Sequence, residues 1–357
     1  MRVPENIETP AVVVDSMRIE RNIGRMADAA AAARVALRPH AKTHKCAEIA
    51  RMQLARGAAG LTVATLAEAE AFAAAGCPSV FVAFPLWAQS SGRPERIKAL
   101  RSATDLRIGV DSVPAAEALA AAAPGAQVLI EIDSGQHRTG VAASRAGELS
   151  AECHRLGLEV LGAFTHPGHS YGGADAVEGA VADEQAALSA AGEAIARVTG
   201  RAAELSGGSS PTAFAGLGGE TAPLTEVRPG TYVFGDRQQM HLSGLTADDI
   251  ALVVAARVVS APRPGEAVLD CGSKALTSDR AGWLEGHGLI LEAPEATIAW
   301  LSEEHAVVRG LAESSLSVGD LVRVVPNHVC PVVNLTGSLL VVRDGAVTGR
   351  WPVIGRR

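Results

Sequence analysis

Eight short apolar runs alternate with helical stretches between about residues 35 and 235. The runs are continuous and rich in Val, Ile and Ala, which is typical of strands buried on both faces. They span residues 36–44, 60–65, 79–84, 105–110, 127–133, 159–166, 202–208 and 226–234. Eight strand–helix units predict a (β/α)8 barrel of the TIM type. A doubly wound open sheet is the alternative, and the lack of GxGxxG after the first strand disfavours it.

The pattern of apolar residues changes after about residue 245. Helical periodicity fades, and turn signals separate the strand-like runs that follow. These runs span residues 251–261, 266–276, 296–310, 320–329 and 338–349. We therefore expect a barrel over residues 11–240 and a smaller β-domain that comprises residues 241–357 together with residues 1–10. The apolar run 11–15 could belong to either domain.

Charge and composition exclude several classes of protein. Across 357 residues, 32 Lys and Arg stand against 39 Asp and Glu, so no basic excess indicates nucleic acid or an anionic membrane as partner. No apolar run approaches the roughly 20 residues of a membrane span. The N-terminus lacks the apolar core of a signal peptide. Five scattered cysteines without a CxxC pair indicate a reducing cytoplasm rather than a disulfide framework.

Lysine is rare here, since it provides only four of the 32 basic residues. A lysine in such a chain is a candidate for a role that needs its amine. Lys42 and Lys45 lie with His40 and His44 at the end of the first predicted strand, on the rim where barrels build active sites. Cationic or desolvating neighbours make an amine a usable nucleophile or base. A solvated basic turn is the alternative.

Polar segments also follow later predicted strands. Residues 133–140 form either a binding rim or a plain polar loop, whereas residues 165–172 bring two histidines and a tyrosine to the same rim. Residues 206–210 and 229–232 are rich in Gly, Ser and Thr. Small residues with free N–H groups at the last two strands of a barrel commonly hold phosphate. A flexible loop is the alternative for these segments.

His328 and Cys330 form a candidate metal-binding pair in the β-domain. On a strand, residues two apart face the same side, so both could bind one ion. Two protein ligands would suit a catalytic ion with open positions. A buried histidine and a buried cysteine of the core are the alternative.

Taken together, these residues resemble a known family. The chain resembles the fold-type III pyridoxal-phosphate enzymes, the alanine-racemase-like group. The features that carry the likeness are a lysine at strand one, an arginine after strand five, a histidine after strand six and small residues at strands seven and eight. Within this group, the chain most resembles the D-serine dehydratase and D-threonine aldolase branch. The likeness spans nearly the whole chain, and its most specific segments are PHAKTHK (39–45) and PNHVC (326–330).

The resemblance implies pyridoxal 5'-phosphate as the cofactor. Lys42 would carry it as a Schiff base and act as the catalytic residue. Arg138 would approach its phenolic oxygen, and His166 would lie against its ring. Tyr171 would reach the pyridine nitrogen, with His169 beside it. The phosphate would be held by small residues, namely Gly207, Gly208, Ser209, Gly230 and Thr231.

The resemblance also bears on the reaction. Racemases of this group use a tyrosine of the partner's C-terminal domain, and the only tyrosines here, Tyr171 and Tyr232, lie outside that region. Simple racemisation is therefore disfavoured. The resembling dehydratases carry His-x-Cys with zinc, and the resembling aldolases carry His-x-Asp with manganese or magnesium. A thiolate selects zinc over magnesium, so Cys330 favours a dehydratase.

We therefore expect a lyase that depends on pyridoxal phosphate and Zn²⁺, with Mn²⁺ or Mg²⁺ as the alternative ion. Its substrate would be a D-3-hydroxy amino acid, converted by β-elimination to a 2-oxo acid and ammonia. The alternative is D-threonine-aldolase-like cleavage to glycine and an aldehyde. An amino-acid racemase, a non-catalytic pyridoxal carrier or a cofactor-free Schiff-base barrel fits less well. The role of Arg228, which matches the racemases' pyridine-facing arginine, stays open, and the resemblance implies a homodimer.

Overall fold

The computed structural model describes residues 1–217, 223–312 and 316–356. The chain divides into two compact units. The barrel unit comprises Arg25–Lys42, Ile49–Gly230 and the residues from Ile354 onward. The β-unit comprises Met1–Gly24, Thr43–Glu48 and Thr231–Val353. No helix in the described ranges is long and apolar enough to cross a membrane.

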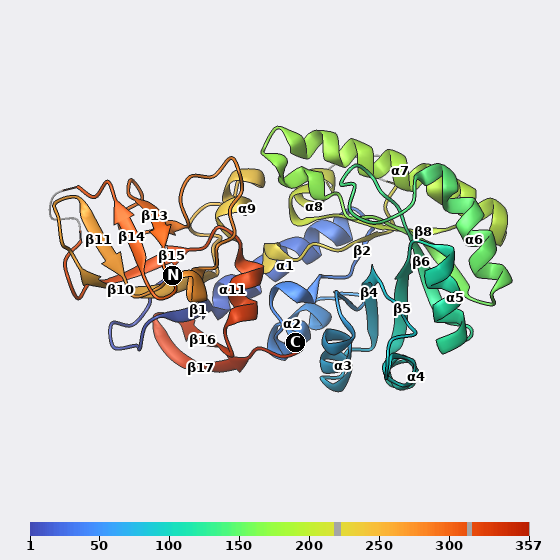
Figure 1. Ribbon diagram of the computed structural model, residues 1–357, viewed down its shortest axis with the longest axis horizontal. Coiled ribbons are helices and arrows are strands. Elements are labelled where there is room, and N and C mark those ends of the chain that lie inside the picture. Colours follow the sequence, from blue (N-terminus) through green and yellow to red (C-terminus); the bar gives the residue numbers. More distant parts are fainter. Residues whose placement is uncertain (218–222, 313–315, 357) are drawn as a thin grey trace. The chain divides into compact units, whose positions relative to one another are not determined.

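Eight parallel strands form one curved sheet in the barrel unit (Figure 1). They are β2 (Ala36–Leu37), β3 (Leu61–Val63), β4 (Ser79–Pro85), β5 (Asp105–Val110), β6 (Gln127–Glu131), β7 (Glu159–Phe164), β8 (Glu204–Gly207) and β9 (Glu226–Val227). They follow the order β3–β4–β5–β6–β7–β8–β9–β2. A parallel bridge between His40 and Thr62 joins the segment after β2 to β3. The predicted (β/α)8 fold is confirmed, and the open-sheet alternative is not.

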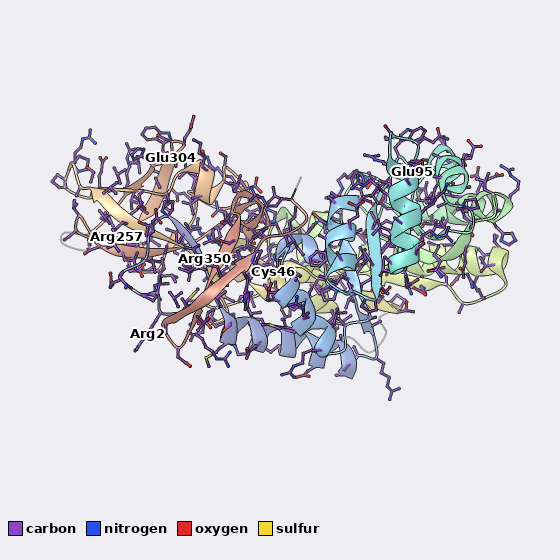
Figure 2. The ribbon with its side chains drawn as sticks, turned by 90° about the horizontal axis from the view of Figure 1, so that it is seen from below. Arg2, Cys46, Glu95, Arg257, Glu304 and Arg350 are labelled. Carbon is purple, nitrogen blue, oxygen red and sulfur yellow. The ribbon has the colours of Figure 1, made fainter. Side chains whose placement is uncertain are left out.

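Helices connect these strands and cover the outer face of the sheet (Figure 1). They are α1 (Ser16–Ala32), which begins in the β-unit, α2 (Ala47–Ala55), α3 (Leu66–Ala74), α4 (Arg93–Ala103), α5 (Val113–Ala122), α6 (Ala146–Arg155), α7 (Ala176–Thr199) and α8 (Ser210–Gly216). The buried stripe of α5 is Ala- and Leu-rich, whereas Glu95 lies on the exposed face of α4 (Figure 2). This amphipathic pattern explains why the stretches fold as helices against the sheet.

The inside of the barrel has its own aromatic core. The rings of Phe81 and Phe164 meet edge to face, with centroids 5.0 Å apart, and Leu129 packs with them. A Cβ at Gly109 would come within 2.7 Å of the Phe164 ring, so glycine provides the room that this ring needs. The core fills the barrel below the rim where the predicted site residues begin.

The first and last barrel strands are much shorter than the apolar runs that predicted them. Strand β2 ends at Leu37 and β9 at Val227, and a proline, Pro39 or Pro229, follows two residues later, before the 3-10 turn η1 (Ala41–Thr43) or η4 (Thr231–Val233). Proline lacks the N–H group that the next ladder bond needs, so it ends the strand. Lys42 therefore sits on a turn rather than on a strand.

The β-unit contains a nine-stranded sheet with β1 (Ala11–Asp15) inside it. Strand β1 pairs antiparallel with β10 (Leu252–Ser260) and parallel with β16 (Ser338–Arg343). The other strands are β11 (Glu266–Leu269), β12 (Leu289–Ile290), β13 (Thr297–Leu301), β14 (Ala306–Arg309), β15 (Leu321–Val325) and β17 (Ala346–Pro352). The run 11–15 thus belongs to the β-unit, and the division differs from the expected boundaries of 11–240 and 241–357.

Two predicted strands of the β-unit end early. Residues 271–276 lie beyond β11, and their last part forms the short helix α10 (Ser273–Leu276). The run 320–329 ends as β15 at Val325, and helix α11 (Val329–Leu335) follows. Another short helix, α9 (Arg237–Leu242), starts at the N-cap Asp236, whose carboxylate accepts the Gln239 N–H at 2.8 Å. Among these three helices, only α9 has a side-chain cap at its N-terminus.

Candidate active site

Lys42 and His40 lie at the carboxyl end of β2 in the barrel unit. The backbone of His40 is fixed on both sides, because its N–H donates to Pro229 O at 3.0 Å and its residue bridges to Thr62. Burial, and then the positive charges of Lys42 and Arg228, hold the pKa of His40 well below its usual value. His40 is therefore a neutral imidazole beside the amine of Lys42.

His166, directly after β7, is a second neutral imidazole. Burial lowers its pKa well below the usual value, and the charges of Lys42, Arg138 and Arg228 lower it further. Three cations, of which Lys42 and Arg138 are predicted site residues, therefore act on one histidine of the barrel unit. Such a concentration of positive charge favours an anionic ligand, and pyridoxal phosphate is anionic at its phenolic oxygen and its phosphate. These residues fit the predicted cofactor.

The guanidinium of Arg228 points into the barrel core. Its Nε donates to Ser206 Oγ at 2.8 Å, and one Nη donates to the Thr165 carbonyl. Its Cζ lies 5.5 Å from the Phe81 ring centroid and 5.2 Å from that of Phe164. Burial lowers its pKa. These bonds and rings fix Arg228 as a buried cation of the barrel interior.

A buried ion pair between Arg38 and Glu226, missed by the sequence analysis, is linked to Arg228 through Ser206. Ser206 Oγ donates to Glu226 Oε1 at 2.6 Å, and Arg38 Nε donates to Glu226 Oε2 at 2.6 Å. Arg38 also donates to Ser79 Oγ at 2.8 Å. An arginine and a glutamate inside two predicted strands were the available signal, since charges inside a barrel need partners.

The predicted phosphate residues Gly207, Gly208 and Ser209 form the buried turn between β8 and α8. Gly208 takes a left-handed conformation, with φ +77°, and its N–H donates to Glu184 Oε1 at 2.6 Å. Ser209 caps α8 by a reciprocal pair of bonds with Thr212. The sequence analysis missed Glu184, which lies within the long Ala-rich helix α7.

Gly230 and Thr231 follow β9, at the boundary between the two units. The Gly230 N–H donates to Ser210 Oγ at 3.2 Å, within the barrel unit. Thr231 belongs to the β-unit, and its hydroxyl is buried without a hydrogen-bond partner in the described parts of the chain. A buried hydroxyl in this state is suited to a ligand oxygen.

His169 and Tyr171 lie on the 3-10 turn η3 (Gly168–Gly172), after β7. Tyr171 and His166 lie on the same side, with ring centroids 6.4 Å apart. His169 Nε2 is 3.3 Å from Asp183 Oδ2, and a Cβ at Gly135 would come within 3.1 Å of its ring. The structure thus places both residues beside the histidine predicted to lie against the cofactor ring.

Arg138 is carried by the loop that follows β6. Its neighbour Thr139 donates to Glu131 Oε1 at 2.7 Å, and Asp133 accepts the N–H groups of Gly135 and His137. Burial raises the pKa of Glu131, which lies at the end of β6. These bonds fix the backbone on either side of Arg138, whose side chain is exposed.

His328 and Cys330 lie in the β-unit, but not on a strand as predicted. His328 is the N-cap of α11, and Cys330 lies in its first turn, followed by Pro331. Proline fits a first helical turn, where its missing N–H has no helical partner. The Val329 N–H donates to the buried carboxylate of Asp236 at 3.0 Å, which fixes this turn.

Asp279 is another residue that the sequence analysis missed. Its Oδ2 lies 2.9 Å from His328 Nδ1, and although burial opposes charge, Cys330 and Asp279 raise the pKa of His328 to about 11. A carboxylate on Nδ1 leaves Nε2 to face a metal ion. Thr43 Oγ1 lies 3.3 Å from Cys330 Sγ. No group of three or more such ligand side chains is arranged to hold an ion among the described residues, so the pair would need water or substrate as further ligands.

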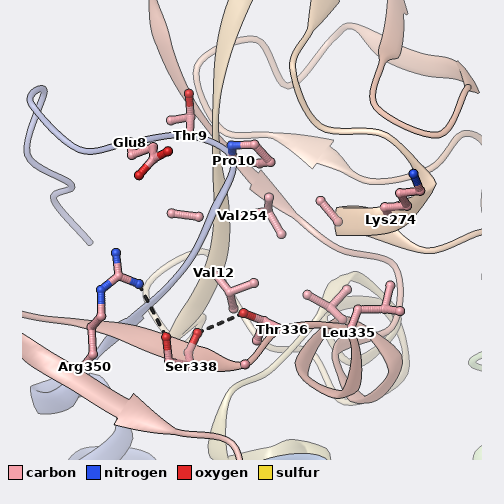
Figure 3. A pocket seen from close by; sticks show the side chains of 14 residues that line it. Glu8, Thr9, Pro10, Val12, Val254, Lys274, Leu335, Thr336, Ser338 and Arg350 are labelled. Atoms are coloured by element: carbon pink, nitrogen blue, oxygen red, sulfur yellow. Dashed lines mark hydrogen bonds between the residues drawn. The ribbon is translucent and has the colours of Figure 1, made fainter.

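A pocket of about 460 Å³ opens elsewhere in the β-unit (Figure 3). Arg350 and Ser338 lie on one side of it and Lys274 on another, with Val12 and Val254 between them. None of the predicted site residues lines it. This pocket is therefore not the candidate active site.

The chain is similar to known proteins over most of its length. Residues 14–238 match the family model "Alanine racemase, N-terminal domain", and residues 251–342 match the model "Putative serine dehydratase domain". The chain is 35% identical over 350 residues to D-threo-3-hydroxyaspartate dehydratase of Delftia sp. (strain HT23), covering 91% of each chain. A solved structure of that dehydratase has a TM-score of 0.87 and covers 99% of both chains.

Aldolases are also among the relatives. The chain is 32% identical over 370 residues to D-threonine aldolase of Arthrobacter sp., covering 98% of this chain and 93% of the aldolase. The solved D-threonine aldolase of Filomicrobium marinum has a TM-score of 0.88 at 29% identity, covering 100% of this chain and 98% of that one. The chain therefore belongs to the alanine-racemase-like, fold-type III family of pyridoxal-phosphate enzymes, in the group of lyases with a serine-dehydratase-type second domain.

Proposed function

We propose that this chain is a D-3-hydroxyamino-acid dehydratase that uses pyridoxal phosphate and zinc. The observation that carries this proposal is the His328–Cys330 pair, with Asp279 bonded to the imidazole. An imidazole and a thiolate form a ligand set that zinc prefers to magnesium or manganese. One solved structure of a variant of the related Delftia dehydratase is described as a metal-free form, which supports a metal in that relative.

The barrel residues hold the cofactor and move the proton. Pyridoxal phosphate, when bound, withdraws electrons from the Cα of the substrate amino acid. Lys42 holds the cofactor, and its amine then takes the Cα proton as general base. His40 and His166 stay neutral, so neither adds a positive charge to the cations that face the anionic ring and phosphate. When the cofactor is bound, Tyr171 and Arg138 would orient its ring, Tyr171 at the nitrogen and Arg138 at the phenolic oxygen.

The β-unit residues hold the metal. His328 and Cys330 bind it, and Asp279 orients the imidazole. A Lewis-acidic ion makes a β-hydroxyl group a better leaving group. The products of β-elimination are a 2-oxo acid and ammonia. The alternative is retro-aldol cleavage to glycine and an aldehyde, and the likeness to D-threonine aldolase supports it.

Two further parts of the proposal concern the whole protein. We propose that it works as a homodimer, without nucleic acid or membrane partners, on a small D-amino acid. We also propose that it works in the cytoplasm, where its five scattered cysteines stay reduced. Mass measurement in solution tests the first of these, and fractionation of the source cell tests the second.

Product analysis with D-threonine tests the reaction. The purified protein is incubated with pyridoxal phosphate and either Zn²⁺ or Mn²⁺. We expect 2-oxobutyrate and ammonia, with zinc the better ion. Cys330→Ala should abolish turnover while the protein stays yellow, and Lys42→Ala should abolish both turnover and the absorbance band of the bound cofactor. Glycine and acetaldehyde as products would assign the aldolase reaction instead.

A further inference from the structure

Glu184 is a carboxyl group that the proposed reaction does not use. It projects from α7 and is 1% exposed. Its Oε1 accepts the Gly208 N–H at 2.6 Å. A Cβ at Gly207 would lie 2.4 Å from the same oxygen, so Glu184 packs directly against the Gly207–Gly208 backbone.

The same carboxyl reaches the other side of this turn through Thr212. The Thr212 side chain is a hydrogen-bond partner of Glu184. Thr212 Oγ1 accepts the Ser209 N–H at 2.9 Å, and Ser209 Oγ accepts the Thr212 N–H at 3.3 Å. Glu184 therefore fixes Gly208 directly and Ser209 through one residue.

Gly208 needs such a restraint. Its φ of +77° lies in the left-handed region, and a glycine has more backbone freedom than any other residue. Without an acceptor for its N–H, the peptide between Gly207 and Gly208 would lose the bond that sets its orientation. A phosphate site needs its donors fixed before the ligand arrives, because ordering them on binding weakens the affinity.

We propose that Glu184 is a positioning residue for the phosphate group of the cofactor, acting through Gly208 and Ser209. The inference rests on the proposed function and on the phosphate-binding role that the resemblance implies for this turn. The hydrogen bonds of Glu184 go to the Gly208 N–H and to the Thr212 side chain, so in this proposal it acts on the affinity for the cofactor and not on the chemical step. Burial raises its pKa to about 7, so near neutral pH part of the population carries no charge that would repel the phosphate.

Pyridoxal, which lacks the phosphate, gives a test that does not depend on turnover. Dissociation constants for pyridoxal phosphate and for pyridoxal are measured by absorbance after removal of bound cofactor. We expect Glu184→Ala to weaken the binding of pyridoxal phosphate about tenfold or more, because the Gly207–Gly208 turn must then be ordered on binding, and to change the affinity for pyridoxal less than about twofold. Glu184→Gln keeps an oxygen acceptor for Gly208 and should stay within about threefold of the unaltered protein for both.

The matched control is Glu193→Ala, an exposed glutamate on the same helix, which should change neither constant. If Glu184→Ala does not fold, Glu184→Asp withdraws the carboxylate by one methylene and should give the same phosphate-specific loss. If Glu184→Ala weakens the binding of both ligands equally, or of neither, the inference is overturned. It is also overturned if the unaltered protein binds both ligands equally well, whereas the D-threonine assay separately decides the proposed reaction.

Discussion

The buried Arg38–Glu226 pair offers a quantitative test of how the barrel interior supports the site. Arg38 Nε and Glu226 Oε2 are 2.6 Å apart, with side chains 2% and 6% exposed. Arg38→Met keeps most of the apolar stem and removes the charge, which leaves the Glu226 carboxylate buried without its cation. Breaking a buried pair from one side costs about 3–5 kcal/mol in free energy of unfolding.

A surface pair in the same unit provides the matched control. Arg96 and Glu70 form a bidentate contact, at 2.6 and 2.8 Å, and their side chains are 41% and 38% exposed. Solvent screens such a pair, so Arg96→Met should cost less than about 1 kcal/mol. The two variants thus differ mainly in burial.

Urea unfolding of the cofactor-free protein, followed by far-ultraviolet circular dichroism, measures both effects. We expect a clearly lower midpoint for Arg38→Met and almost no change for Arg96→Met. Arg38→Met combined with Glu226→Leu should recover much of the loss, because no uncompensated charge remains. Equal midpoints for the two single variants would refute the reasoning. Glu226 is also bonded to Ser206, so its displacement should loosen the bond from Ser206 to Arg228.

Three further predictions follow from the two units. Asp279→Asn should weaken zinc binding about 10- to 100-fold, measured by competition with a chromogenic chelator, because the imidazole loses its carboxylate partner; an unchanged constant would count against the metal pair. Gly207→Ala should weaken pyridoxal phosphate binding, because its Cβ would lie 2.4 Å from the Glu184 carboxylate, whereas Gly179→Ala, with nothing within 4 Å, should not. Glu184 has a pKa raised from 4.5 to about 7, so it binds its proton more tightly in the folded state. Its contribution to stability is therefore full below about pH 4.5 and falls by about 3 kcal/mol as the pH rises to 7; Glu184→Gln should flatten this slope in urea unfolding at several pH values, and an unchanged slope would contradict the assignment.

The sequence by itself determined the order of elements and the barrel. Strands buried on both faces are continuous apolar runs, and the Ala-rich stretches between them have a single buried face, so both patterns are local. The likeness also gave the family, which the comparisons confirm, and it named Lys42 and His166, whose local surroundings the structure now describes.

Tertiary structure decided what depends on contacts between distant residues. Apolar pattern alone placed His328 and Cys330 on a strand, but the Asp236 carboxylate holds this segment as a helix start. Glu184, Glu226 and Asp279 went unnoticed, because a carboxylate in sequence carries no sign of burial or of its partner. Their bonds span 24, 188 and 49 positions along the chain. Only folding brings such groups together, and for the buried Glu184 and Glu226 the cost of burying an unpaired polar group then favours the paired geometry.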